Sequence, residues 1–192
     1  MPVRPAKLII IMQREHAKGI AGIYDARLVL LDGVTDGAAR SALAARALID
    51  SDEPLMIANS DQLLDWNVDH FLAACDPWDG GIVTFTASHS KWSYVRRRDM
   101  FVEEVAEKRV ISDEATCGVY WWRQGKDFVR SVDAMISKDI RTSGEFYIAP
   151  AYNEYIAEGA RVVTYHIAPE QMHGLGTPSD LAAYLAAHSV AA

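Results

Sequence analysis

Cysteine is scarce in this chain. Only Cys75 and Cys117 occur among its 192 residues, and they do not form a Cys-x-x-Cys pair. The sequence therefore argues against a framework of disulfide bonds and against a zinc site built from thiolates. Two isolated thiols suit a reducing cytoplasm.

Long apolar runs and an excess of positive charge are missing as well. The apolar run Leu8 to Met12 is too short for a signal-peptide core or a membrane span, and charged residues follow it at once. The net charge of −7 argues against a nucleic-acid binder, which would carry a basic face. We expect a soluble cytoplasmic protein without membrane or nucleic-acid partners. A local Lys or Arg can still hold the phosphate of a small ligand.

What the chain does have is an alternation of strand-like and helix-like segments. Half of its residues are apolar, enough for the core of one ordinary domain. Apolar runs typical of buried strands alternate with Ala- and Leu-rich helical patterns in the first half. This rhythm predicts an α/β fold with a mainly parallel sheet flanked by helices. The strand-like segments are 7–12, 26–33, 53–59 and 80–87, and the helix-like ones are 37–50 and 67–75.

The second half is more mixed. In residues 92–108, apolar and polar residues alternate as in two strands on either side of Arg98-Asp99. The aromatic segment 115–125 predicts a further strand. Amphipathic spacing predicts a helix at 126–137. Another helix is expected at 149–160, closed by Gly159, and a strand follows at 161–168. A last helix at 177–190 has a well-marked start, with Thr177 as the N-cap.

Asp61 follows the short apolar run Leu55 to Ala58 in the polar sequence Asn-Ser-Asp-Gln. In open α/β sheets, ligands bind beyond the carboxyl ends of the strands, and a carboxylate there can hold Mg²⁺. A carboxylate in this position also caps helices or turns the chain. From the residue alone, that simpler interpretation is favoured.

Four segments together resemble the sugar-1-phosphate nucleotidyltransferases, or NDP-sugar pyrophosphorylases, and in particular those of capsule and surface-polysaccharide gene clusters. The resemblance extends from about Lys7 to Leu185 and is carried by the order of the four segments. It implies a Rossmann-like nucleotide-binding sheet with a sugar-binding extension. The segments are DGVTDGAARSALAARALIDSDEPLMIANSDQLLD, VAEKRVISDEATCGVYWW, GEFYIAPAYNEYIAEGARVVTYHI and MHGLGTPSDLAAYL.

The resemblance implies an activity and a division of the chain. A sugar 1-phosphate would attack the α-phosphate of an NTP, and pyrophosphate would leave, so the partners are small phosphorylated molecules. Such transfer depends on positioning and charge neutralisation more than on a covalent nucleophile. We expect a single domain over residues 1–192, with a nucleotide and metal side at 1–87 and a substrate side at 88–192.

The resemblance also gives roles to individual residues. Asp61 would hold Mg²⁺ against the phosphates, and Lys108 would bind the substrate phosphate. Glu107 would accept hydrogen bonds from a substrate hydroxyl. Gly37 would let the backbone approach a nucleobase. These residues have simpler interpretations: Gly37 as a turn, and Glu107-Lys108 as an exposed pair worth under about 1 kcal/mol.

Gly118 and Tyr120 would line the substrate pocket, although packing in an aromatic strand explains Tyr120 equally well. His173 lies in a loop that the resemblance places near the substrate, and a surface or packing role is at least as well supported. We see no Ser-His-Asp or Cys-His set in a convincing context.

The chain departs from the family pattern in two places. The family's first strand and its Gly-x-Gly-x-Arg phosphate loop have no counterpart, so the predicted sheet is incomplete at its N-terminus. The second metal carboxylate, expected near 148–153, is also missing, and Glu145 or Glu154 are the candidate substitutes. The departures leave three hypotheses: an impaired nucleotidyltransferase, a non-catalytic relative that binds sugar phosphate or nucleotide, and a glycosyltransferase of similar fold. A sheet with an uncovered edge further predicts a homo-oligomer or a partner that supplies the missing unit.

Overall fold

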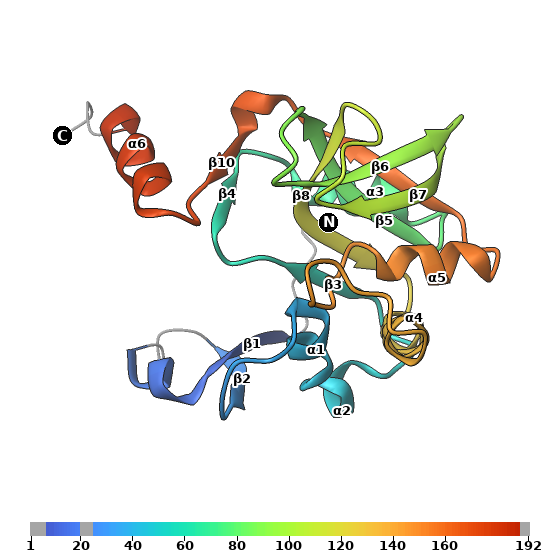
Figure 1. The fold of residues 1–192 in the computed structure, drawn as a ribbon, viewed down its shortest axis with the longest axis horizontal. Coiled ribbons are helices and arrows are strands. Elements are labelled where there is room, and N and C mark those ends of the chain that lie inside the picture. The colour runs from blue at the N-terminus through green and yellow to red at the C-terminus, as the bar shows by residue number, and fades with distance from the viewer. Residues whose placement is uncertain (1–6, 20–24, 189–192) are drawn as a thin grey trace. The chain divides into compact units, whose positions relative to one another are not determined.

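The chain folds as two units, and each unit is built from two separate stretches of sequence (Figure 1). The computed structural model describes residues 7–19 and 25–188, so the last two residues of the helix predicted at 177–190 lie outside the described residues. Unit 1 comprises residues 1–55 and 122–160, and unit 2 comprises residues 56–121 and 161–192. The prediction of one domain divided at residue 87 stays a prediction.

Unit 1 begins with two parallel strands. Strand β1 (Leu8–Gln13) pairs with β2 (Ala26–Leu31) in register, from Leu8 opposite Ala26 to Gln13 opposite Leu31. A short 3₁₀ helix, η1 (Arg14–Gly19), follows β1. Both strands were predicted from their runs of Leu, Ile and Val, and both are confirmed. None of their residues is fully buried, which is unusual for strands of this composition.

Helices make up the rest of unit 1. The helix predicted at 37–50 forms as two short helices, α1 (Ala38–Leu43) and α2 (Arg46–Ile49). The amphipathic helix α4 (Gly125–Ser137) and the helix α5 (Ala151–Ala157) are confirmed where the sequence predicted them. Their common core is aromatic: the fully buried Trp122 stacks on Tyr152 with 4.1 Å between ring centroids.

Unit 2 contains a six-stranded sheet in the order β3-β8-β5-β9-β7-β6. Strands β5 and β9 are parallel, whereas β7 is antiparallel to both β6 and β9. An additional antiparallel pairing joins β6 back to β8, so the sheet closes on itself like a barrel. The strands are β3 (Leu55–Ala58), β5 (Gly80–Thr86), β6 (Ser93–Arg98), β7 (Phe101–Glu107), β8 (Glu114–Trp122) and β9 (Val162–His166).

The α/β class is therefore confirmed, but the predicted mainly parallel sheet needs correction. The hairpin of β6 and β7 turns at Asp99-Met100, as the alternation around Arg98-Asp99 predicted, and a hairpin is necessarily antiparallel. The buried Glu114 of β8 links three strands of this sheet. Its carboxylate accepts hydrogen bonds from Thr84 of β5 (2.8 Å) and Arg97 of β6 (2.7 Å).

A smaller arm completes unit 2. Strand β4 (Gln62–Leu64) pairs antiparallel with β10 (Met172–Gly174), which follows the 3₁₀ helix η2 (Pro169–Gln171). Helix α3 (Val68–Cys75) is capped by Asn67, and α6 (Pro178–His188) is capped by Thr177, the second as predicted. No helix within the described part of the chain is long and apolar enough to cross a membrane.

Candidate functional site

The polar segment after β3 is fastened to β8. The backbone N–H of Asn59 donates to the carbonyl oxygen of Gly118 (2.9 Å). The side-chain amide of Gln62 donates to the carbonyl oxygen of Cys117. Asn59 and Gln62 thus anchor both ends of the Asn-Ser-Asp-Gln sequence, and the residues between them are presented to solvent.

Gly118 makes this attachment possible. Its φ of +70° lies in the left-handed region that side chains rarely adopt. A Cβ atom on Gly118 would lie 2.6 Å from Nδ2 of Asn59 and 2.9 Å from Nε2 of Gln62. The glycine therefore leaves the space that the two amide side chains occupy. This is a local structural role, and the predicted contact of Gly118 with substrate stays a prediction.

Asp61 is exposed between these two anchors and lies beside the loop that follows β10. The N–H of Leu175 donates to the backbone carbonyl of Asp61 (2.8 Å). A Cβ on Gly176 would come within 2.9 Å of the Asp61 carboxylate, so only glycine leaves that carboxylate its present place. The resemblance gave a role to the Asp61 side chain but none to this loop. The neighbouring loop could have been suspected from its Gly-x-Gly sequence.

The described residues do not form a protein cage for a metal ion. No group of three His, Cys, Asp or Glu side chains that could hold one is present in residues 7–19 and 25–188. Asp61 and the predicted second ligand Glu145 belong to different units. The alternative Glu154 is buried in unit 1 and forms an ion pair with Lys138 (2.6 Å). An exposed single carboxylate fits a Mg²⁺ ion that takes its other ligands from water and substrate phosphates.

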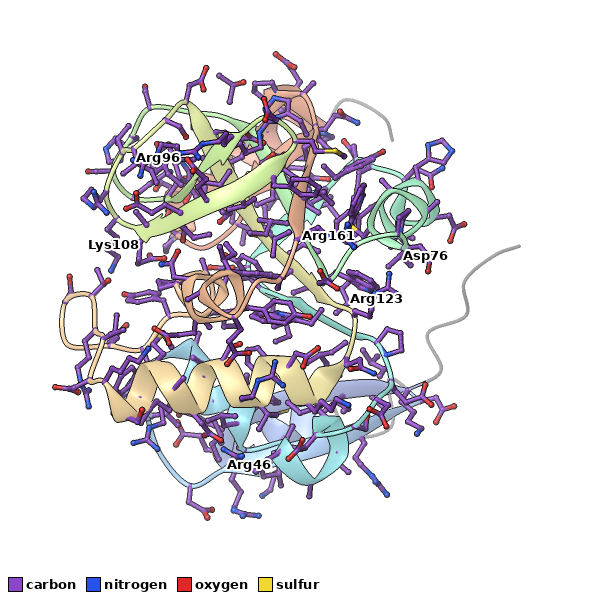
Figure 2. All side chains as sticks on the ribbon, turned by 90° about the vertical axis from the view of Figure 1, so that its right-hand side faces the viewer. Arg46, Asp76, Arg96, Lys108, Arg123 and Arg161 are labelled. Carbon is purple, nitrogen blue, oxygen red and sulfur yellow. The ribbon has the colours of Figure 1, made fainter. Side chains whose placement is uncertain are left out.

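Glu107 ends strand β7, and Lys108 follows it in a turn. The Lys108 N–H donates to the carbonyl of Trp92 (3.1 Å), and its backbone is left-handed, with φ of +53°. Figure 2 shows Lys108 at the edge of the unit, with its side chain directed outward. Glu107 is half-buried, and its carboxylate accepts a hydrogen bond from the Ser93 hydroxyl.

Tyr120 is buried, with 4% of its surface exposed, so it does not line an open surface. Its hydroxyl is hydrogen-bonded to Thr116 (3.0 Å) and to Ser93. Burial raises the pKa of Tyr120, so the phenol stays protonated at neutral pH. Ser93 therefore connects Glu107 with Tyr120. Sequence reasoning missed Ser93, although its place opposite Glu107 in a predicted hairpin was a usable signal.

Gly37 and Glu145 lie together in unit 1. Gly37 has φ of +122°, and a Cβ there would lie 2.3 Å from the carbonyl oxygen of Phe146. The chain itself thus requires glycine at this position, whether or not a nucleobase approaches. Glu145 is exposed and forms a small turn with Thr142.

A cavity of about 310 Å³ opens at the carboxyl ends of β1 and β2 in unit 1. Ligands in α/β proteins bind at such strand ends. Arg14 and Asp32 form an ion pair of 2.6 Å in its wall. Sequence reasoning did not predict this cavity. The remaining lining residues are Gln13, Glu15, Leu31 and Gly33.

His173, for which the sequence left the role open, is held inside the arm of unit 2. Its Nε2 is 2.8 Å from the Asp65 carboxylate. Its ring lies edge-on to Tyr184 and His188 of α6, with centroids 5.2 and 5.6 Å away. These contacts give His173 a packing role between β10 and α6.

No family model and no curated protein matches this chain. Solved structures do. A nucleoside-diphosphate-sugar pyrophosphorylase from Vibrio cholerae RC9 is similar with a TM-score of 0.76 and 25% identity, over 90% of this chain and 74% of that one.

Two further structures share the fold at lower identity. A protein from Bacillus anthracis, provisionally assigned as a glucose-1-phosphate thymidylyltransferase, has a TM-score of 0.73 and 14% identity, over 96% of this chain and 76% of that one. The inositol-1-phosphate CTP transferase of T. maritima has a TM-score of 0.65 and 13% identity, over 91% of this chain and 71% of that one. The fold of this chain is thus that of nucleotide-sugar pyrophosphorylases and related nucleotidyltransferases.

Proposed function

We propose that this chain binds a sugar 1-phosphate and an NTP and catalyses nucleotidyl transfer with release of pyrophosphate, in the synthesis of surface-polysaccharide precursors. The observation that carries the proposal is the structural similarity to the V. cholerae pyrophosphorylase over 90% of the chain. The attachment of the Asn59–Gln62 segment to β8 supports it, because this attachment presents an exposed carboxylate, Asp61, beside a glycine loop.

The residues of unit 2 would act mainly by charge and position. Lys108 would place its ammonium group on the sugar phosphate, and Glu107 would accept a hydrogen bond from a sugar hydroxyl. The cavity at the ends of β1 and β2 is a candidate position for the nucleotide, with Gly37 following in the next loop. Aligned phosphates react without a covalent enzyme intermediate.

We propose Mg²⁺ as the cofactor, with Asp61 as its protein ligand. A bound Mg²⁺ would neutralise charge on the phosphates as pyrophosphate leaves. Because Asp61 is the one carboxylate of unit 2 that we assign to the ion, we expect metal affinity to be weak without a phosphate ligand. Glu145 remains the candidate for a second carboxylate.

The second candidate function is binding without turnover. The 192-residue chain contains no Gly-x-Gly-x-Arg loop whose N–H groups would hold a triphosphate. This feature favours a non-catalytic relative or an impaired enzyme, and we therefore expect slow turnover from this chain alone. A glycosyltransferase ranks third, because Asn59-Ser60-Asp61-Gln62 lacks the Asp-x-Asp metal motif.

The test measures binding and turnover separately. Calorimetry with each NTP and a panel of sugar 1-phosphates, with Mg²⁺ present, should find at least one sugar phosphate that binds. Pyrophosphate release should then be measurable but well below the median enzyme rate of about 10 per second. Binding without any pyrophosphate would select the second candidate function, and no binding to any of these compounds would refute both.

Two variants probe the metal assignment. Asp61→Asn should abolish pyrophosphate release and the dependence of NTP binding on Mg²⁺. The matched control is Asp65→Asn, an exposed carboxylate four residues further on whose partner is His173. This control should behave like the unmodified chain. Equal activity of Asp61→Asn and the unmodified chain would remove Asp61 from the site.

We also propose that the chain associates with a second copy of itself through β1. The described residues add no third strand to the β1–β2 sheet, and Leu8 is 44% exposed. Strand β1 carries no charge from Leu8 to Gln13, whereas β2 carries Arg27 within its length. Charged residues protect strand edges from pairing, so β1 presents the less protected edge.

A further inference from the structure

Four polar side chains in unit 2 form one connected chain of hydrogen bonds. Ser93 of β6 bonds to Glu107 of β7, and Tyr120 of β8 bonds both to Ser93 and to Thr116. Ser93, Thr116 and Tyr120 are buried, and only Glu107 is partly open to solvent. A buried polar network that ends on one accessible carboxylate is the feature that the proposed function leaves unexplained.

The direction of these hydrogen bonds follows from counting protons. An ionised carboxylate only accepts, so the single Ser93 hydroxyl hydrogen goes to Glu107. Ser93 must then accept from Tyr120, whose own single hydrogen is thereby used. Tyr120 in turn accepts from Thr116. The order of donation is Thr116 to Tyr120 to Ser93 to Glu107, and such directed chains strengthen each of their bonds.

We propose that Ser93 is a positioning residue that holds the Glu107 carboxylate toward the hydroxyl groups of a sugar 1-phosphate. Tyr120, which is hydrogen-bonded to Thr116, would in turn orient the Ser93 hydroxyl. The inference rests on the proposed function. It assigns Tyr120 an indirect role, because a side chain with 4% exposure is too deep to touch a ligand at the surface. Lys108, next to Glu107 in sequence, would meet the phosphate of the same ligand.

Glucose 1-phosphate and inorganic phosphate are the two probes for this arrangement. Both offer a phosphate to Lys108, but only the sugar phosphate offers hydroxyls to Glu107. Ser93→Ala should weaken glucose 1-phosphate binding about tenfold, the usual effect of one hydrogen bond to a charged group, and leave phosphate binding unchanged. Ser93→Thr keeps the hydroxyl and should restore most of the affinity. If Ser93 had only a structural role, Ser93→Ala would change the affinity for both ligands to the same extent.

A second measurement tests the hydrogen-bond chain without any ligand. Thr116→Val and Glu107→Gln alter its two ends, and melting temperatures of the single and double variants form a cycle. If Thr116 and Glu107 are coupled, the double variant loses less stability than the two single variants lose in total. Adding Ser93→Ala should remove this coupling. Additive losses would overturn the proposal, as would full glucose 1-phosphate affinity in Ser93→Ala. If the unmodified protein does not prefer glucose 1-phosphate to inorganic phosphate, the proposed function is contradicted instead. The melting-temperature cycle alone would then decide whether the four side chains form a coupled hydrogen-bond network.

Discussion

At Lys108 a long charged side chain stands on a left-handed backbone, with φ of +53°. This conformation costs a non-glycine residue about 1 kcal/mol or more, and such costs are often found at functional positions. We expect Lys108→Gly to change the free energy of unfolding by less than about 1 kcal/mol, because relief of backbone strain offsets the flexibility of glycine. Binding of a sugar 1-phosphate should fall about tenfold to a hundredfold, since a charge-assisted contact is lost.

The hairpin offers a matched control for this prediction. Asp99 has nearly the same backbone conformation, with φ of +54°, in the turn between β6 and β7. Asp99→Gly should therefore change stability as Lys108→Gly does, as measured by urea denaturation, without altering ligand affinity by calorimetry. If both variants bind the sugar phosphate as tightly as the unmodified chain, Lys108 is only a turn residue.

Among the elements, β8 depends on Gly118 more than its aromatic sequence suggests. Gly118→Ala brings both a strained φ and a Cβ within 2.6 Å of Asn59. We expect a loss of about 2–4 kcal/mol in unfolding free energy and release of the Asn59–Gln62 segment from β8. Hydrogen exchange at the Asn59 amide, which donates to Gly118, should report that release.

Gly144 separates the two causes of this loss. It also has a positive φ, +85°, but a Cβ there would meet nothing within 4 Å. Gly144→Ala should cost only about 1 kcal/mol and leave the exchange of the Asn59 amide unchanged. Equal losses in the two variants would mean that backbone strain alone, and not contact with Asn59 and Gln62, requires glycine at 118.

The same elements show what the sequence could and could not predict. Strand and helix positions were predictable because their patterns are local: β1, α3 and the hairpin around Asp99 all lie where expected. The closure of the sheet was not, because it depends on the non-local pairing of Tyr94 with Ala115.

The candidate site likewise has features that the sequence could predict and others that it could not. The exposure of Asp61 could be read from a polar sequence after an apolar strand. The contact of Gly176 with Asp61 and the bond from Ser93 to Glu107 join residues far apart along the chain. A single sequence carries no signal for such contacts unless a hairpin register is already known. The metal pair Asp61 and Glu145 stays a prediction, because the two residues lie in different units.

For the molecule as a whole, the self-association that we propose would depend on the β1–β2 sheet. A two-stranded sheet is at best marginally stable without further strands or a covering layer. Antiparallel pairing of β1 with β1 of a second copy, centred on Ile10, would place Leu8 opposite Met12 and Lys7 opposite Gln13. No like charges then meet across the pair, so the register is self-complementary.

Ile10→Lys should abolish this pairing, because the two-fold axis would bring two ammonium groups face to face. Leu28→Lys is the matched control, since Leu28 is the partner of Ile10 on β2 and places the same charge one strand away from the axis. Light scattering over a range of concentrations should find a dimer for the unmodified chain and for Leu28→Lys, and a monomer for Ile10→Lys. An unmodified chain that stays monomeric at high concentration would contradict the pairing. Equal dissociation of both variants would mean that any charge on this sheet unfolds it, and that β1 is not specifically the interface.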